Sequence, residues 1–249
     1  MNTTLKALLL AATLIGAPLA VAAATAPLAP AAVLADPARS ETDKALDANR
    51  KAAQMLTFIG VKPGDKVADI FPGGGYFTRI FSKAVGPAGK VYGVVRQAPA
   101  NDTLTTNPSF KNIAIAAGPW ENFNPAEKLD VIFSSQFQHD LYNPKYGAEG
   151  GGAAGVDKVN KAMFNALKPG GVLIIVDHAG RPGTGTTEHD TLHRIDQPVV
   201  VQSLTKAGFK LDAESQILRN PADPKTANVF DASIRGKTDQ FVLKFRKPA

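Results

Sequence analysis

Three consecutive glycines, Gly73, Gly74 and Gly75, stand between an expected strand and an expected helix, and this turn constrains the fold more than any other segment. Residues 66–71 have strand-like spacing, residues 76–85 carry apolar side chains at helical spacing, and residues 91–95 begin a second strand. A strand, a glycine turn, a helix and a second strand within about thirty residues form a βαβ crossover, which favours a parallel sheet. The sequence therefore predicts an α/β fold.

The glycine turn also indicates a ligand. Glycines allow a ligand to approach the backbone beside a helix N-terminus, where free N–H groups point outward. A nucleotide-like ligand explains the turn better than a tight turn without one. A P-loop requires Gly-Lys-Ser/Thr, but Tyr76-Phe77-Thr78 follows the glycines, so a phosphate cradle is not expected. The dinucleotide fingerprint Gly-x-Gly-x-x-Gly fails at Thr78.

The remaining pattern is an acidic residue followed by a glycine loop, Asp69-Ile70-Phe71-Pro72-Gly73-Gly74-Gly75-Tyr76. It resembles the first motif of class I S-adenosylmethionine-dependent methyltransferases. Leu167-Lys168-Pro169-Gly170-Gly171 is similar to the turn before strand five of that family, and residues 129–133 resemble its fourth strand. Segments 177–178, 191–196, 207–209 and 236–243 resemble a branch of predicted bacterial methyltransferases, many with export signals, whose natural substrate is not established.

The resemblance implies a Rossmann-like doubly wound sheet, mostly parallel, with a C-terminal antiparallel hairpin. It implies S-adenosylmethionine as cofactor, bound by Asp69, Phe71, Pro72, Gly73, Gly74, Gly75, Tyr76, Arg96, Gln97, Pro119 and Trp120. Three positions depart from the family pattern. Phe71 replaces the first glycine, Arg96-Gln97 replaces the acid that holds the ribose, and Pro119-Trp120 replaces the acid near the adenine amine. Gln97 could serve the ribose instead, and Trp120 could stack on adenine.

All four histidines lie in the half of the chain that should line the pocket. His139 and Asp140 follow the expected fourth strand, at the carboxyl edge where ligands bind in such sheets, and we expect them to act as the catalytic acid/base pair. His178, His189 and His193 are candidate substrate contacts. On a helix, His189 and His193 would share one face as in metal sites, and zinc or manganese is conceivable with the nearby aspartates, but we expect no metal.

The N-terminus predicts export. Residues 1–24 combine Lys6, an apolar stretch and Ala22-Ala23-Ala24, which is typical of a cleaved signal peptide and too short for a membrane span. Residues 25–39 are rich in Ala and Pro and are expected to form a disordered spacer. The chain has no cysteine, which excludes a lipoprotein anchor and suits an oxidising compartment. The net charge of +6 is spread along the sequence, so no nucleic-acid surface is expected.

Residues 40–249 are expected to form one domain, since a chain of 249 residues can bury one sizeable core. The sequence predicts a helix that opens at Ser40 and runs to about residue 59, a mobile loop at 147–155, helices near 156–167 and 197–207, and strands near 112–117, 131–135, 172–176, 210–218 and 240–247. A doubly wound fold requires a helix within 97–111, but the apolar pattern of this segment supports one only weakly.

These patterns favour methyl transfer to a small-molecule acceptor in the periplasm. Three alternatives stay open: a binding protein that kept the fold without catalysis, a metal-dependent hydrolase that uses the His/Asp cluster, and a structural or envelope-interaction role. The sequence does not indicate the acceptor atom or the oligomeric state.

Overall fold

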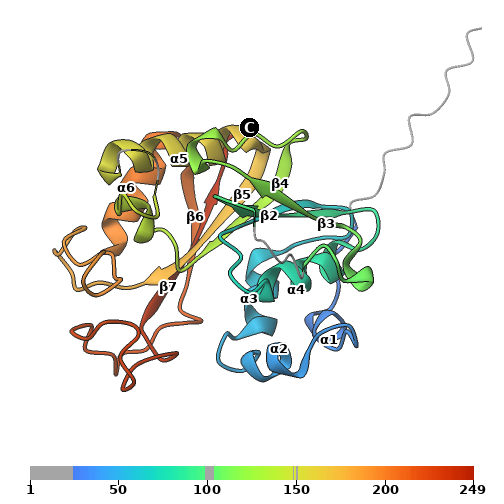
Figure 1. Ribbon diagram of the computed structural model, residues 1–249, viewed down its shortest axis with the longest axis horizontal. Helices are drawn as coiled ribbons and strands as arrows, with labels where there is room; N and C mark the ends of the chain where they lie inside the picture. The colour runs from blue at the N-terminus through green and yellow to red at the C-terminus, as the bar shows by residue number, and fades with distance from the viewer. Residues whose placement is uncertain (1–24, 99–103, 148, 150) are drawn as a thin grey trace, which may run out of the picture.

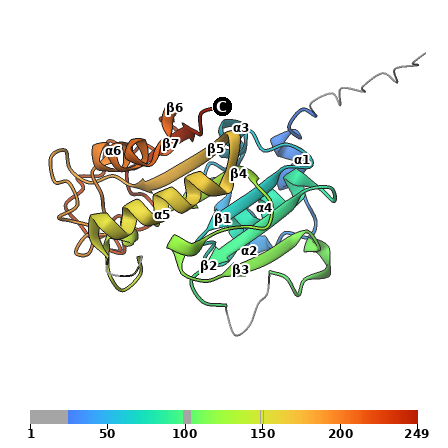
Figure 2. The ribbon, with the colours of Figure 1, turned by 90° about the horizontal axis from the view of Figure 1, so that it is seen from above.

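The computed structural model of the protein describes residues 25–98, 104–147, 149 and 151–249. Its centre is a seven-stranded sheet with the order β3-β2-β1-β4-β5-β7-β6 (Figures 1 and 2). The strands are β1 (Lys66–Ile70), β2 (Lys90–Val95), β3 (Ile113–Ala117), β4 (Leu129–Ser135), β5 (Leu167–His178), β6 (Lys210–Ser215) and β7 (Gln240–Arg246). The first five are parallel, and β7 lies antiparallel between β5 and β6.

Helices cover both faces of the sheet. The helices are α1 (Pro30–Leu34), α2 (Glu41–Leu46), α3 (Ala52–Ile59), α4 (Tyr76–Val85), α5 (Gly152–Ala166) and α6 (Gln197–Ala207), with short 3-10 turns η1 (Pro108–Phe110), η2 (Trp120–Asn122) and η3 (Asp140–Tyr142). One apolar cluster joins α5 and α6 to one face, and a second joins α1, α3 and α4 to the other. This is the expected doubly wound arrangement, with the parallel strands buried on both faces.

The βαβ crossover is confirmed, because β1, α4 and β2 follow one another at nearly the predicted bounds. Helix α4 begins directly after Gly75, whose φ of 77° lies in the left-handed region. The helix ends at Gly86, which also has a positive φ, so a glycine flanks the helix at each end. The carboxyl end of β1 consequently opens onto the glycine turn.

The segment 25–39 is not a disordered spacer. Pro30 starts α1, and Val33 is only 1% exposed within the core that α3 and α4 share. The buried guanidinium of Arg39 forms a bidentate pair with Asp47 at 2.9 and 2.5 Å and donates to the carbonyl of Leu34. The prediction of disorder was wrong because composition does not show that one apolar side chain and one arginine have tertiary partners. The predicted signal peptide, 1–24, lies outside the described residues.

Three further expectations need correction. The helix that opens at Ser40 is two helices, because Lys51 adopts a left-handed backbone between α2 and α3. Residues 152–155 of the expected mobile loop are the first turn of α5, with Gly155 buried. In the described part of 97–111 the helical element is only the 3-10 turn η1. The C-terminal antiparallel pair is confirmed, although a long connection rather than a tight turn links β6 to β7.

In the described residues, no helix has both the length and the apolar character that a bilayer crossing requires.

Candidate functional site

The glycine turn has the backbone of a ligand cradle. Phe71, Gly73 and Gly75 have φ values of 57°, 54° and 77°, in the region that glycine adopts without strain. Around Gly73 and Gly74, a Cβ atom would meet nothing within 4 Å, so space is open on the exposed side of the turn. Gly75 is different, because a Cβ there would lie 2.2 Å from Cδ2 of Leu104. Gly73 and Gly74 therefore face open space, whereas Gly75 packs inward.

Asp69 lies at the carboxyl end of β1, buried below the turn. Its carboxylate accepts a 2.6 Å hydrogen bond from the Thr78 hydroxyl of α4. Burial raises the pKa of Asp69 to about 7, although the hydrogen bond from Thr78 and the charge of Arg50 act in the opposite direction. The carboxyl group of Asp69 therefore changes between its protonated and ionised forms near pH 7, directly below the glycine turn.

Two cavities meet at the carboxyl edge of the sheet. The first, of about 460 Å³, is lined by Asp69, the 71–74 turn, Tyr76 and part of α2. The second, of about 440 Å³, is lined by His178, Phe230, Arg235, Thr238 and Gln240. Both are also lined by a shared set of residues, namely Leu46, Arg50, Phe77, Ser135 and Gln136. The arrangement provides two adjacent subsites that share one wall.

Five of the predicted cofactor residues do not line these two cavities, and the first of them is Gly75, which packs against Leu104. Arg96 is exposed and donates to the carbonyl of Gly147, and Gln97 is exposed beside it. Pro119 lines a separate cavity of about 260 Å³. Trp120 is 3% exposed, its indole N–H donates to the carbonyl of Tyr146, and its ring packs 4.9 Å from Phe137. A ring packed in this way has no free face for adenine, so the stacking expected of Trp120 would need the ring to move.

Phe71 is an exposed aromatic residue beside the glycine turn. Its side chain is 47% exposed, stacks on Phe137 at 4.7 Å and meets the edge of Trp120 at 6.3 Å. It occupies the position of the first glycine of the loop and keeps a positive φ that L residues rarely adopt. A strained backbone is often found at a functional site, where the surrounding structure maintains it.

His178 is the histidine that lines the second cavity. It is the last residue of β5, and its Nδ1 lies 2.7 Å from the hydroxyl oxygen of Thr238. Burial lowers the pKa of His178 to about 4, against the attraction of Asp177, so the ring is neutral at pH 7. The bond with Thr238 holds the ring beside the wall that the two cavities share.

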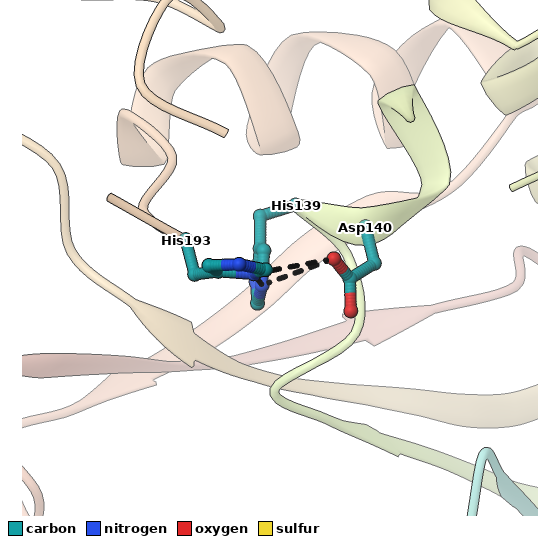
Figure 3. Close-up of side chains that lie close together, drawn as sticks. All are labelled: His139, Asp140 and His193. Carbon is teal, nitrogen blue, oxygen red and sulfur yellow. Dashed lines mark hydrogen bonds and ion pairs between the residues drawn. The ribbon is translucent and has the colours of Figure 1, made fainter. Parts of the chain in front are cut away.

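His139 and Asp140 lie in a second cluster, next to the cavity rather than on its wall. His139 is 3% exposed, and its Nδ1 lies 2.7 Å from Oδ1 of Asp177. Oδ2 of Asp177 accepts from the backbone N–H of His139, and Oδ1 accepts from that of His178. His193 approaches from the loop after β5, and Figure 3 shows the two imidazole rings and the Asp140 carboxylate pointing toward one another. Burial lowers the pKa of His139, but the carboxylates of Asp177 and Asp140 outweigh it and raise the pKa. The structure thus brings His139, Asp140 and His193 together, and His139 lines neither of the two cavities.

The loop that carries His193 is firmly anchored. The guanidinium of Arg194 is fully buried and pairs with Asp223 at 2.8 and 3.2 Å, and it donates to the carbonyls of Ala179 and Ala227. Arg194 is therefore an ion-pair partner of Asp223. His189 and His193 lie in turns and not on a helix, so their four-residue spacing does not align them. The ring of His189 instead lies 6.3 Å from Tyr142.

Comparison with known proteins agrees with this geometry. Residues 28–125 match the family model described as protein-L-isoaspartate(D-aspartate) O-methyltransferase. The ubiquinone/menaquinone biosynthesis C-methyltransferase UbiE of Pasteurella multocida is 30% identical over 120 residues, which are 47% of this chain and 41% of that protein. The chain therefore matches about two fifths of the length of this curated relative.

Solved structures show the same fold over most of the chain. A SAM-dependent methyltransferase from Aquifex aeolicus superposes with a TM-score of 0.54 at 20% identity, covering 88% of this chain and 98% of that one. A possible exported protein from Bordetella parapertussis gives a TM-score of 0.55 at 16% identity, over 82% and 68% of the two chains. These likenesses show that the chain has the fold of the class I S-adenosylmethionine-dependent methyltransferases.

Three residues at this site were not among the predicted site residues. Arg50 lies where the cavities meet, with its guanidinium 4.6 Å from the ring of Tyr76, and its side chain has no hydrogen bond or ion pair in the described part of the chain. Gln136 follows β4 with a φ of 57° and bonds to Gln240 of β7. Asp177 joins His139 to His178. Gln136 and Asp177 could have been predicted as site residues, because they lie at the ends of expected strands. Arg50 had no such signal, because it lies on an N-terminal segment outside every motif.

Proposed function

We propose that the protein transfers a methyl group from S-adenosylmethionine to a small-molecule acceptor. The observation that carries this proposal is the pair of cavities with a common wall, one at the glycine turn and one at His178. Each has a volume within the range of about 300–1,000 Å³ that small-ligand sites occupy. A cofactor in the first and an acceptor in the second would meet beside Ser135 and Gln136.

The first cavity fits the cofactor. The open space at Gly73 and Gly74 lets a ligand lie against the backbone, and Asp69 supplies a buried carboxyl group below it. Among the described residues, the guanidinium of Arg50 has no anionic partner within ion-pair distance, which suits the carboxylate of a methionine half. When bound, S-adenosylmethionine supplies an electrophilic methyl group on a sulfonium sulfur.

The chain's own contribution is to position the acceptor and to receive its proton. Methyl transfer requires an in-line approach of the acceptor atom, so a rigid wall contributes through orientation. His178 is held by Thr238 through Nδ1, and it would accept the proton of an acceptor O–H or N–H group through Nε2. We therefore assign the acceptor-facing role to His178 in place of His139.

We also propose that the protein works in the periplasm. The charged start, apolar stretch and alanine triplet of residues 1–24 support export, as does the fold shared with a possible exported protein. The native product is expected to begin near Thr25. N-terminal sequencing that returned Met1 or Asn2 would contradict this part of the proposal.

Calorimetric titration with S-adenosylmethionine and S-adenosylhomocysteine tests the cofactor. We expect the wild type to bind both ligands and to methylate at least one acceptor in a panel of phenols, amines and thiols. The His178→Gln variant should bind S-adenosylmethionine equally well but methylate that acceptor about 10²–10⁴-fold more slowly. His189→Gln is the matched control and should keep full turnover. A folded wild type that binds neither ligand at millimolar concentration would refute the proposal, and binding without turnover of any acceptor would support the ligand-binding alternative.

A further inference from the structure

We propose that His139, Asp140 and His193 form a binding site for one zinc ion or a similar divalent transition-metal ion, with an open coordination position. This inference concerns a site outside the two cavities and does not depend on methyl transfer. From the sequence we expect no metal, and the four-residue spacing suggests His189 as the partner of His193. The structure assembles a different set of donors, from the end of β4 and from the loop after β5 (Figure 3).

The distances among the three donor atoms match a tetrahedral ion. Nε2 of His139 lies 3.3 Å from Nδ1 of His193, and both nitrogen atoms lie 3.5 Å from Oδ1 of Asp140. Zinc bonds to nitrogen and oxygen of about 2.0–2.1 Å give a tetrahedron with edges of about 3.3–3.4 Å. The three atoms therefore form one face of such a tetrahedron. Two imidazoles and one carboxylate are also donors that zinc takes in catalytic sites, where the fourth position is left open.

The surroundings orient the donors toward a common point. Asp177 accepts from Nδ1–H of His139 at 2.7 Å, which fixes the tautomer and leaves the lone pair of Nε2 facing the cluster. A carboxylate behind a histidine is the usual second shell of a metal ligand. His193 has a left-handed backbone with φ of 53°, and the buried ion pair of Arg194 holds its loop in place.

One donor atom also lacks a hydrogen bond among the described residues. Oδ1 of Asp140 is a buried oxygen atom without a hydrogen bond among the described residues. A buried carboxylate oxygen in this state is costly, and a cation would satisfy it.

The site lies beside the second cavity. His193 contacts Phe230 at 5.1 Å between ring centroids, and Phe230 lines that cavity. The ring of His139 lies 5.9 Å from the ring of His178. The ion would therefore lie close to an acceptor in the second cavity.

Elemental analysis and zinc titration of the protein isolated without an affinity tag test the proposal. We expect about one zinc per chain, and a zinc affinity that falls at least tenfold in Asp140→Asn and in His193→Ala, whose side chains are partly exposed and replaceable. Cobalt should give the intense visible absorption of a tetrahedral ion in the wild type and lose it in both variants.

His189→Ala is the matched control and should leave zinc affinity and the cobalt spectrum unchanged. A folded wild type that binds neither ion at 100-micromolar concentration, about a hundred times a micromolar dissociation constant, would overturn the proposal. An equal loss in His189→Ala would overturn the assignment of ligands. Cofactor binding is measured separately with a chelator present, so failure here and failure of the methyltransferase proposal give different results.

Discussion

Gly74 and Gly75 are adjacent in the glycine turn but have different roles, since Gly74 faces open space for a ligand and Gly75 packs against Leu104. Valine substitutions at the two positions should distinguish ligand binding from stability. In Gly74→Val, the new Cβ meets nothing within 4 Å, and the backbone lies outside the strained region. An exposed substitution of this kind changes the free energy of unfolding by about 0.5 kcal/mol or less. In Gly75→Val, a φ of 77° costs an L residue about 1–2 kcal/mol. The 2.2 Å approach to Leu104 adds an overpacking cost of about 1–3 kcal/mol, for a total of about 2–5 kcal/mol.

Urea unfolding and calorimetric titration with S-adenosylmethionine measure the two effects separately. Gly74→Val should keep wild-type stability and bind the cofactor at least tenfold more weakly, a loss of about 1.4 kcal/mol, because its side chain fills the open side of the turn. Gly75→Val should unfold at much lower urea. Equal stability of the two variants would refute the packing argument, and unchanged affinity in a folded Gly74→Val would refute the placement of the cofactor.

Three other perturbations test separate parts of the structure. Arg194→Met should lower the free energy of unfolding by about 3–5 kcal/mol in urea, because it leaves Asp223 buried without its partner; a loss below about 1 kcal/mol would contradict this. Deletion of residues 25–39 should destabilise the fold by a similar amount, because it removes Val33 from the core and the partner of Asp47, whereas a disordered spacer predicts an unchanged midpoint. The pKa of Asp69 is about 7 in the folded state, against 3.8 for an ordinary Asp, so the folded state keeps this proton to higher pH than the unfolded state does. The free energy of unfolding of the wild type should therefore fall between about pH 4 and 7 relative to that of Asp69→Asn, and parallel pH profiles of the two proteins would rule this out.

The elements that the sequence predicted well are those whose ends are marked locally. Helix α6 begins after Asp196, carries Pro198 in its first turn, and ends at Gly208, whose backbone is left-handed. The βαβ crossover has glycines at both helix ends and clear apolar periodicity between them. In both cases the signal lies within the segment itself, so tertiary structure was not needed to read it.

The elements that were missed depend on partners far away in sequence. Helix α1 is too short to be stable alone, and it forms because Val33 packs against α3 and α4. The donor set at His139 depends on Asp177, 38 residues further on, which selects the ring nitrogen that is free. The spacing of His189 and His193 suggested a pair, but the left-handed backbone of His193 turns its ring toward His139 instead. Spacing predicts proximity only when the local structure is known.

Phe71 carries the last prediction, since it replaces a family glycine and also offers the exposed aromatic face beside the glycine turn. Phe71→Gly should relieve a left-handed backbone worth about 1–2 kcal/mol and lose ring contacts with Phe137 and Trp120 worth about 0.5–1.5 kcal/mol each. These effects nearly cancel, so the urea midpoint should change little. Cofactor affinity should nevertheless fall about tenfold, since aromatic stacking on a base contributes about 1–3 kcal/mol. Phe230→Ala, which removes an exposed ring from the other cavity, should leave that affinity unchanged. Equal or tighter binding by Phe71→Gly would mean that the ring blocks the cofactor site instead of forming part of it.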